Sequence, residues 1–117
     1  MIVSFECYCT TQWGDVLYIV GSEPVFGCWD TDGALAMKCI APHKWRVEVE
    51  IPDAKFRSFT YKYFLINREN TLVWEHGKSR EFIKPSAPFT TVHTKDLWEP
   101  GNNVQFPWTT SAFTKVL

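Results

Sequence analysis

Residues 45–51, WRVEVEI, alternate strictly between apolar and charged side chains. Successive side chains of a β-strand point to opposite faces of a sheet, so this period of two predicts a strand with one dry face and one wet face. Trp45 could face either a ligand or the core. Because it shares its phase with Val47 and Val49, we favour the core.

Similar strand patterns recur along the chain. VSFECY alternates, VLYIVGS is a nearly continuous apolar run typical of a buried strand, and SFTYKYFLI is β-branched and aromatic throughout. Turn-forming Gly, Pro, Asn and Asp residues separate the runs at intervals of about 8–12 residues, which predicts an all-β sandwich or open barrel. No window predicts an amphipathic helix. The predicted strands are residues 3–8, 16–22, 45–51, 58–66, 71–75, 80–84 and 89–94.

The composition excludes several classes of partner. The chain has 117 residues, 45% of them hydrophobic, which is enough for one domain with its own core. Its net charge of −1 lacks the basic stripe of a nucleic-acid-binding protein, and no charge block or long apolar run predicts a membrane partner. The opening MIVSFECYC does not resemble a secretory signal. We therefore expect a cytoplasmic protein whose four cysteines are reduced.

The sequence offers little for catalysis or for metal binding. Cys7 and Cys9 resemble half of a zinc site, but no second pair follows, and two buried thiols on one strand face are the plainer interpretation. His43, His76 and His93 stand singly, and no nucleophile elbow or phosphate-binding loop occurs. Paired carboxylates could hydrolyse glycosides, but so short a chain leaves little room for an enclosed cleft. We expect a non-catalytic chain without metal or cofactor.

Aromatic residues are the unusual feature, at 16% of the chain with six Trp. Trp29 falls in a turn-like loop, GCWD, and Trp74 ends the predicted strand 71–75. If strands 58–66 and 71–75 form a hairpin, Lys62 comes close to Trp74. A pyranose ring has an apolar face that stacks on indole and hydroxyls that need polar partners, so these residues predict a sugar site. The alternatives are that Trp29 plugs the end of the sandwich and that Trp74 belongs to the core.

Four segments, taken in order, resemble the starch-binding domain, carbohydrate-binding module family 20. They are LYIVGSEPVFGCWDTDGALAM, KWRVEVEIPDA, FTYKYFLI and TLVWEHGKSREF, and the resemblance spans residues 2–94. It implies an antiparallel, immunoglobulin-like β-sandwich of seven to eight strands. It also implies a module that binds α-1,4-glucan chains such as starch, glycogen, maltooligosaccharides or the analogue cyclodextrin, and that targets an attached enzyme to polysaccharide.

The resemblance places the family's first glucan site on Trp29, Lys62 and Trp74. The two indoles would stack on adjacent glucose rings, and Lys62 would bond to hydroxyls. Glu75 and Ser79 stand where the family often adds polar contacts, although Ser79 departs from a common Asn.

Trp13, in the loop after the first strand, matches the aromatic residue of the family's second site. A further aromatic expected before the strand of Trp45 is missing, because CIAPHK offers only His43 there. Trp13 is therefore either a second glucan contact or an incidental exposed aromatic.

The C-terminal part differs from the rest in its residue pattern. Two Pro, one Gly and two Asn interrupt it without a steady period, so we place the domain at residues 1–95 and an extended tail or interdomain linker at 96–117. Its apolar residues predict packing on this domain or on a neighbouring one; they are Leu97, Trp98, Phe106, Trp108 and Phe113.

The segment DLWEPGNNVQFPWTTSAFTKV resembles the one that follows the first of two tandem starch-binding domains in cytosolic disproportionating enzymes, which are 4-α-glucanotransferases. This resemblance implies a second tandem module and a catalytic domain beyond this chain. The rival interpretation is a protein-interaction module, a β-sandwich that uses its aromatic surface to pack on a partner or a catalytic domain.

Overall fold

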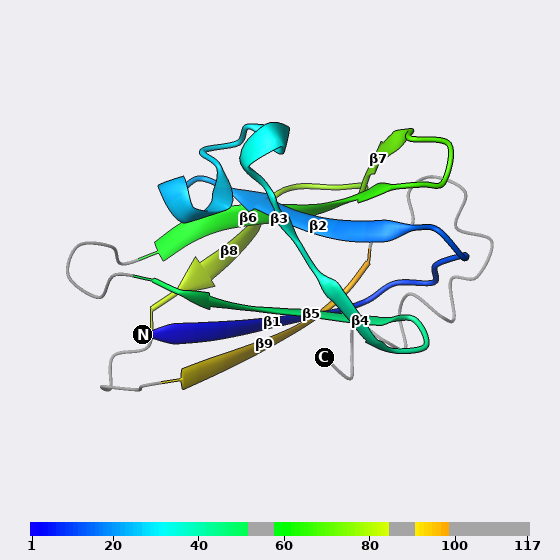
Figure 1. Cartoon of the computed structure of the whole chain (residues 1–117). Helices are drawn as coiled ribbons and strands as arrows, with labels where there is room; N and C mark the ends of the chain where they lie inside the picture. Colours follow the sequence, from blue (N-terminus) through cyan, green and yellow to red (C-terminus); the bar gives the residue numbers. More distant parts are fainter. Residues whose placement is uncertain (52–57, 85–90, 99–117) are drawn as a thin grey trace.

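Two β-sheets lie face to face in residues 1–51, 58–84 and 91–98, the parts that the computed structural model describes (Figure 1). These ranges contain nine strands and two short 3-10 turns. The strands are β1 (Ile2–Tyr8), β2 (Val16–Gly21), β3 (Leu35–Ala36), β4 (Lys38–Ala41), β5 (Lys44–Glu50), β6 (Ser58–Ile66), β7 (Leu72–Trp74), β8 (Arg80–Ile83) and β9 (Thr91–Leu97); the turns are η1 (Pro24–Phe26) and η2 (Thr31–Gly33).

The four-stranded sheet has the order β4-β5-β1-β9. The alternating stretch forms β5 and pairs antiparallel with β1, with Trp45 opposite Cys7. On the other edge of β1, β9 pairs in parallel, with Asp96 opposite Cys7. Trp45 is 6% exposed, so the prediction that its indole faces the core is confirmed.

The five-stranded sheet is built around β6, which pairs with β2 on one edge and with β7 and β8 on the other. Because side chains alternate along a strand, Tyr61 and Tyr63 point into the core while Lys62 and Phe64 lie on the outer face. This strand therefore supplies both the packed interior and the surface on which a site can be built.

Aromatic rings fill the space between the two sheets. The ring of Phe5, on β1, lies 5.5 Å from Phe26 and 5.0 Å from Tyr61, and 6.3 Å from both Phe59 and Phe82. Edge-to-face and tilted contacts of this kind are favourable beyond the area that they bury. Much of the high aromatic content is therefore core, which makes the few exposed rings informative.

The all-β sandwich predicted from the sequence is confirmed, with two differences of detail. The pairing of β1 with β9 is parallel, whereas the other pairings in the described residues are antiparallel. The described residues also hold nine strands rather than seven to eight. The additional strands are β3 and β4, which are short and largely exposed, so they lack the alternation that marks the others.

The boundary placed after residue 95 falls inside β9, and the folded domain continues through Trp98. The backbone N–H of Trp98 donates to the carbonyl of Tyr8 at 3.0 Å, and its side chain packs against the core. Leu97 ends the strand. The predicted packing of Phe106, Trp108 and Phe113 lies outside the described residues.

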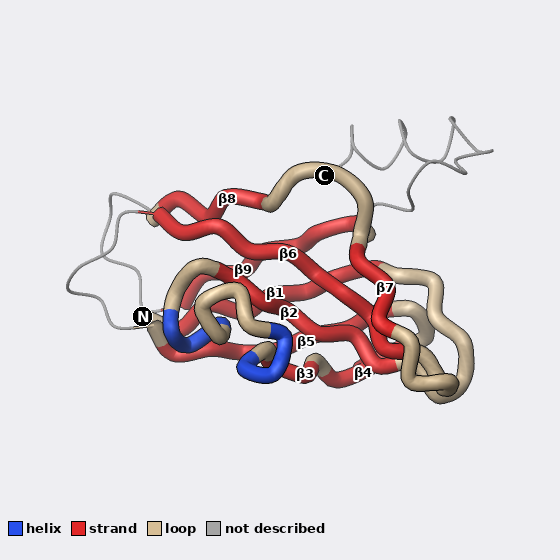
Figure 2. Tube along the Cα trace, turned by 90° about the horizontal axis from the view of Figure 1, so that it is seen from above, coloured by secondary structure: helices blue, strands red, loops and turns tan. Residues whose placement is uncertain are grey.

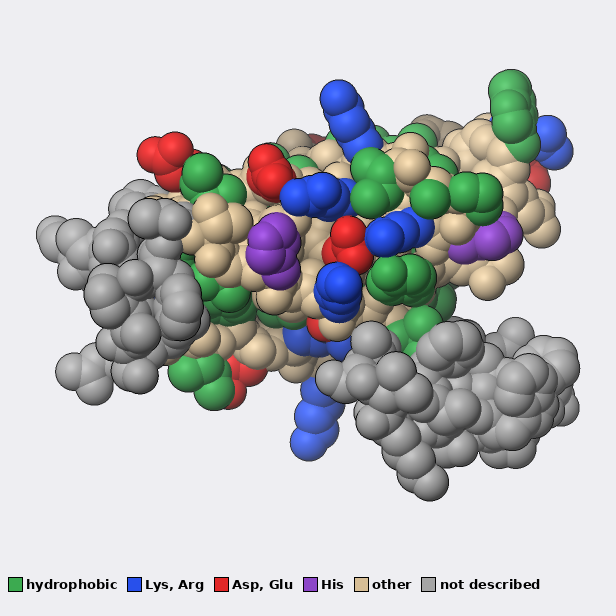
Figure 3. All heavy atoms as spheres, turned by 90° about the horizontal axis from the view of Figure 1, so that it is seen from below, with side chains coloured by type: hydrophobic (Ala, Val, Ile, Leu, Met, Phe, Trp, Pro, Cys, Tyr) green, Lys and Arg blue, Asp and Glu red, His purple; other side chains and the backbone are tan. Residues whose placement is uncertain are grey.

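The outer face of the four-stranded sheet carries charges of both signs (Figure 3). Strand register brings Arg46, Glu6 and Lys95 into one row across three strands. Arg46 pairs with Glu48 at 2.9 Å, and Lys44 lies 5.5 Å from the ring centroid of Tyr8. Such a surface is typical of a solvated face. In the described ranges, neither short helix is long and apolar enough to cross a lipid bilayer.

Candidate functional site

Trp29 stands in the loop that leaves β2. Gly27, Cys28 and Trp29 all have left-handed backbone conformations, with φ of 85°, 49° and 67°. Non-glycine residues rarely adopt such angles, and each costs on the order of 1 kcal/mol or more. The N–H of Trp29 donates to the carbonyl of Gly21 at 2.9 Å, and Trp29 is 41% exposed. The loop therefore presents the indole outward at the end of β2 rather than plugging the sandwich with it.

The loop is compact because two glycines meet in it. A Cβ on Gly27 would lie 2.7 Å from both the carbonyl oxygen of Asp30 and the carbonyl carbon of Gly33. Asp30 caps η2, since its side chain accepts a hydrogen bond from the N–H of Asp32 at 3.0 Å. Figure 1 shows η2 on the outer side of the five-stranded sheet, away from the other sheet, whereas η1 lies at the end of the sheet (Figure 2) and its Phe26 packs against Phe5 in the core.

A row of three rings crosses the outer face of the same sheet. Register places Phe64 opposite Tyr18 on one side and opposite Trp74 on the other. Phe64 stacks on Tyr18 with centroids 5.1 Å apart at 4°, and it contacts Trp74 at 5.1 Å and 51°. Trp74 is 42% exposed, whereas Phe64 is buried. Trp74 is thus a surface residue supported by a second ring, not a core residue.

Lys62 lies beside Trp74, as the hairpin predicts. Its Nζ is 5.9 Å from the centroid of the Trp74 ring and donates to the carbonyl of Gly77 at 2.8 Å. A lysine ammonium has three N–H donors, of which this bond uses one. Lys62 is also opposite Val20 on β2. The next residue, Gly21, accepts the hydrogen bond from the backbone N–H of Trp29. The loop of Trp29 is therefore joined to the end of β2, next to the strand that carries Lys62.

Glu75 is buried, although the resemblance implies a contact with ligand. It is 2% exposed, and its carboxylate accepts from Nε and Nη2 of Arg80 at 3.1 Å and 2.9 Å. It also accepts from the backbone N–H of Tyr63 at 3.3 Å. A carboxylate held by these donors stabilises the sandwich and does not reach the surface. Ser79, in contrast, is exposed.

A polar network that the sequence analysis missed continues inward from Glu75. Asp96 accepts hydrogen bonds from the hydroxyls of Tyr61 and Tyr63, both at 2.7 Å, and lies 3.7 Å from Arg80. Arg80 donates, in addition, to the carbonyl of Leu97. One sequence signal could have revealed Asp96: it shares its strand phase with residues that face inward, Val92 and Thr94.

The network shifts the pKa values of its members. Burial is the main cause that raises the pKa of both Tyr61 and Tyr63, and the charge of Asp96 adds to it. Burial alone would lower the pKa of Arg80, but the hydrogen bonds and charge of Glu75, with the charge of Asp96, outweigh it and raise the pKa. Arg80 therefore stays charged, and the tyrosines stay protonated donors, at any ordinary pH.

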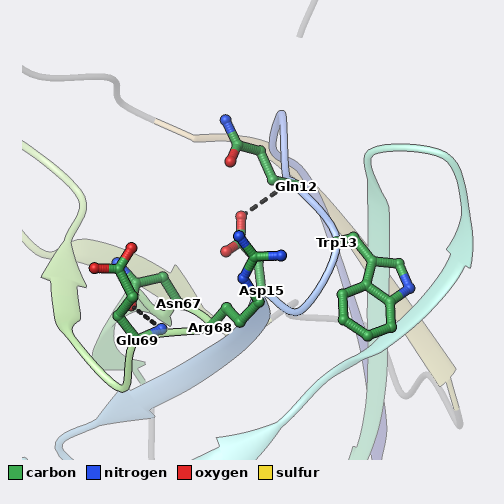
Figure 4. A pocket seen from close by; sticks show the side chains of 6 residues that line it. All are labelled: Gln12, Trp13, Asp15, Asn67, Arg68 and Glu69. Atoms are coloured by element: carbon green, nitrogen blue, oxygen red, sulfur yellow. Dashed lines mark hydrogen bonds between the residues drawn. The ribbon is translucent and has the colours of Figure 1, made fainter.

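Trp13 lies at the opposite end of β2 from Trp29. It is 85% exposed and borders a pocket of about 260 Å³ between two turns (Figure 4). The side chain of Arg68 packs closely over Gly14. A Cβ placed on Gly14 would lie only 3.0 Å from the Cβ of Arg68. The other lining residues are Gln12, Asp15, Asn67 and Glu69. The pocket is thus polar around a single indole.

His43, which takes the place of the missing aromatic, has a structural role. Its Nδ1 accepts from the backbone N–H of Thr11 at 3.1 Å, and the indole N–H of Trp45 donates to the Thr11 hydroxyl at 3.4 Å. These bonds fix the loop that carries Trp13, so the missing ring is not replaced by another stacking surface at this position.

The cysteines are free thiols in the described residues, with Cys7 and Cys9 buried and Cys28 and Cys39 exposed. Burial is the largest cause that raises the pKa of Cys7, and it raises that of Cys9 to about 12. The prediction that both thiols are buried is confirmed, although Cys9 follows the last residue of β1 and only Cys7 lies on the strand. Within the described ranges, His, Cys, Asp and Glu do not gather in a group that could hold a metal ion.

Two half-exposed indoles on the same sheet and its loop, with an ammonium group beside one of them, suit a flat ligand that has apolar faces and polar edges. Sugar rings have this character. The fold and the surface together define a carbohydrate-binding β-sandwich.

Comparisons with known proteins agree. A family model described as "Starch binding domain" matches residues 1–94. The chain therefore belongs to the starch-binding domain family, and it is a non-catalytic carbohydrate-binding module.

Several relatives carry a similar segment within a longer protein. The chain is 34% identical to a glucoamylase of Arthroderma benhamiae over 82% of its length, and 28% identical to the 4-alpha-glucanotransferase DPE2 of Oryza sativa over 92%. It spans 16% and 12% of those two proteins. The family 20 carbohydrate-binding module of a maltotetraose-forming amylase from Pseudomonas saccharophila has a similar fold, with a TM-score of 0.65 and 23% identity over 84% of this chain and 100% of that one.

Proposed function

We propose that Trp29, Lys62 and Trp74 form the main site for α-1,4-glucan chains. The observation that carries this proposal is the placement of Lys62 beside the half-exposed indole of Trp74, and its support is the half-exposed Trp29 in the loop that leaves the neighbouring strand β2. The apolar faces of adjacent glucose rings would stack on the indoles, and hydroxyls would accept from the Lys62 ammonium. Ser79 is close in sequence to Gly77, which Lys62 contacts, and would add a polar contact.

The proposed site predicts weak binding to each sugar unit. Stacked aromatic contacts contribute roughly 0.5–1.5 kcal/mol each, and so do net hydrogen bonds. After the cost of association, dissociation constants of about 10 μM to 1 mM follow. Weak binding suffices for a polymer, because many equivalent sites and a second module raise the effective concentration.

The test is a titration with β-cyclodextrin and maltoheptaose, followed by intrinsic tryptophan fluorescence. Trp29→Ala and Trp74→Ala should each weaken binding, and the double variant should abolish it while circular dichroism stays unchanged. Val73→Ala is a matched control, since Val73 is also 42% exposed but is opposite Leu65 rather than Phe64. A folded wild type that binds neither sugar at millimolar concentration would refute the site and favour a protein-interaction surface.

We propose Trp13 as a second glucan contact, supported by its exposure and by the polar pocket beside it. In this site one sugar ring would stack on the indole, and its hydroxyls would meet Arg68 and Asn67. Trp13→Ala should leave binding of β-cyclodextrin to the main site unchanged within about twofold. It should reduce retention on granular starch, where two contacts act together. Unchanged retention would identify Trp13 as an incidental exposed aromatic.

We also propose that the chain is part of a cytoplasmic 4-α-glucanotransferase acting on glycogen-like glucans, next to a second tandem module and a catalytic domain. The support is the resemblance of residues 96–116 to the segment between such modules, together with the similarity to the rice 4-alpha-glucanotransferase. Enrichment of the native protein on glycogen, followed by an assay for transfer from maltose to glycogen, tests this. Retention without transfer activity would point to another attached enzyme.

A further inference from the structure

Arg80 lies behind the proposed glucan surface and joins two segments that are distant in the sequence. Its guanidinium binds the carboxylate of Glu75 through two nitrogens, 3.1 Å and 2.9 Å away. The same group donates to the carbonyl of Leu97 and lies 3.7 Å from Asp96. Arg80 thus connects the residue after Trp74 with the end of β9.

Glu75 in turn fixes the end of β7. Its backbone N–H donates to the carbonyl of Tyr63 at 3.2 Å, and its side chain accepts from the N–H of Tyr63 at 3.3 Å. These bonds continue the ladder beyond the pair formed by Phe64 and Trp74. The indole of Trp74 is therefore held from below by Phe64 and along the strand by Glu75.

The other end of the connection is equally constrained. Asp96 accepts from the hydroxyls of Tyr61 and Tyr63, each at 2.7 Å. Both tyrosines belong to β6, the strand that also carries Lys62. Breaking the contact between Arg80 and Asp96 would leave β9 attached to β6 through the tyrosines, but the guanidinium that orients Glu75 would then be held to β9 by the Leu97 carbonyl alone.

We propose that Arg80 is a positioning residue of the carbohydrate site: it couples the end of β9 to Glu75 and so sets the orientation of Trp74. This inference rests on the proposed function of Trp74. It makes the geometry of residues 96 and 97, at the end of β9, a determinant of affinity for glucan.

Lysine could not replace Arg80 in this role. The planar guanidinium presents five donors and can bond to the Glu75 carboxylate and the Leu97 carbonyl at once, whereas an ammonium is a compact point charge. Arg80→Lys therefore keeps the buried charge while losing the two-sided connection. This variant therefore tests whether Arg80 orients Glu75 through its hydrogen bonds or only neutralises its charge.

The experiment measures the dissociation constant of β-cyclodextrin by calorimetry for the full chain and for Arg80→Lys. We expect the variant to bind roughly three- to tenfold more weakly. Arg46→Lys is the matched control, because Arg46 also bonds to a carboxylate, that of Glu48 at 2.9 Å, but on the opposite sheet. The control should bind within about twofold of wild type.

A merely structural role is separated by a double-mutant cycle with Trp74→Ala, read by chemical-shift titration. If Arg80 acts through Trp74, Arg80→Lys has no further effect once the indole is gone. The indole N–H resonance of Trp74, assigned by its loss in Trp74→Phe, should also shift in Arg80→Lys while that of Trp29 stays in place.

Two results would overturn the inference: unchanged affinity in a folded Arg80→Lys, or the same fold-loss with and without Trp74. If Arg80→Lys does not fold, Asp96→Asn takes its place in the cycle, with an expected loss of about two- to threefold. A wild type that does not bind β-cyclodextrin would refute the proposed function itself, which is a different result from binding that ignores Arg80.

Discussion

At the scale of single residues, the loop that carries Trp29 depends on Gly27. Its φ is 85°, and a Cβ would lie 2.7 Å from backbone atoms of Asp30 and Gly33. Because neither atom is at the end of a flexible side chain, the loop would have to open. We expect Gly27→Ala to lower the free energy of unfolding by about 2–3 kcal/mol and to weaken cyclodextrin binding with it.

Gly77 gives the comparison for that substitution. Its φ is 96°, but a Cβ there would meet nothing within 4 Å. Gly77→Ala should therefore cost only the conformational term, about 1 kcal/mol. Urea unfolding of both variants measures the difference. Equal losses would mean that the close approach of Gly27 to Gly33 contributes nothing.

The buried thiols predict how stability depends on alkaline pH. The pKa of Cys9 rises from 9.0 to about 12 on folding, chiefly through burial. Between these values the unfolded state binds fewer protons at Cys9 than the folded state does. The contribution of Cys9 to stability is therefore complete below about pH 9 and falls as pH rises, by at most about 1.4 kcal/mol per pH unit. Urea midpoints measured from pH 8 to 11 test this.

Cys9→Ala should make the decrease of stability with pH above about pH 9 less steep. The remainder should persist, because burial also raises the pKa of Cys7, Tyr61 and Tyr63. A wild-type midpoint that stays constant from pH 9 to 11 would contradict the prediction.

At the scale of elements, the strands with clear alternation could be predicted from the sequence, and so could the hairpin that brings Lys62 to Trp74. Local patterns carry this information, because burial on one face imposes a period of two. The short edge strands β3 and β4 could not be predicted, since their residues are largely exposed and lack a period. The burial of Glu75 could not be predicted either, because no sequence pattern links Glu75 to Arg80, the residue that neutralises its carboxylate.

The C-terminal end of the domain is the element on which sequence and structure differ most. A chain that ends at residue 98 keeps Asp96, Leu97 and Trp98 and serves as the reference for a shorter one. A chain that ends at residue 95 loses the acceptor for two tyrosine hydroxyls and a partner of Arg80. Its free energy of unfolding should fall by about 3 kcal/mol or more. Similar unfolding curves for the two truncations would mean that residues 96–98 contribute little to stability and that the domain can end at residue 95.

At the scale of the whole molecule, the two outer faces differ in chemistry. The four-stranded sheet presents charges of both signs (Figure 3), whereas the five-stranded sheet carries the row of Tyr18, Phe64 and Trp74 with Lys62 beside it. A neutral sugar that binds to the second face exchanges hydrogen bonds and apolar contacts rather than charge. The affinity should therefore be insensitive to screening by salt.

The prediction is that the dissociation constant for β-cyclodextrin changes by less than about twofold between low salt and 0.5 M sodium chloride, where screening acts within about 4 Å. Lys62→Met should weaken binding by about tenfold at both salt concentrations, because it removes hydrogen-bond donors. Lys95→Met, on the charged face, should leave binding unchanged. An affinity that falls steeply with salt, or that depends on Lys95, would place the ligand on the four-stranded sheet and would require an anionic partner.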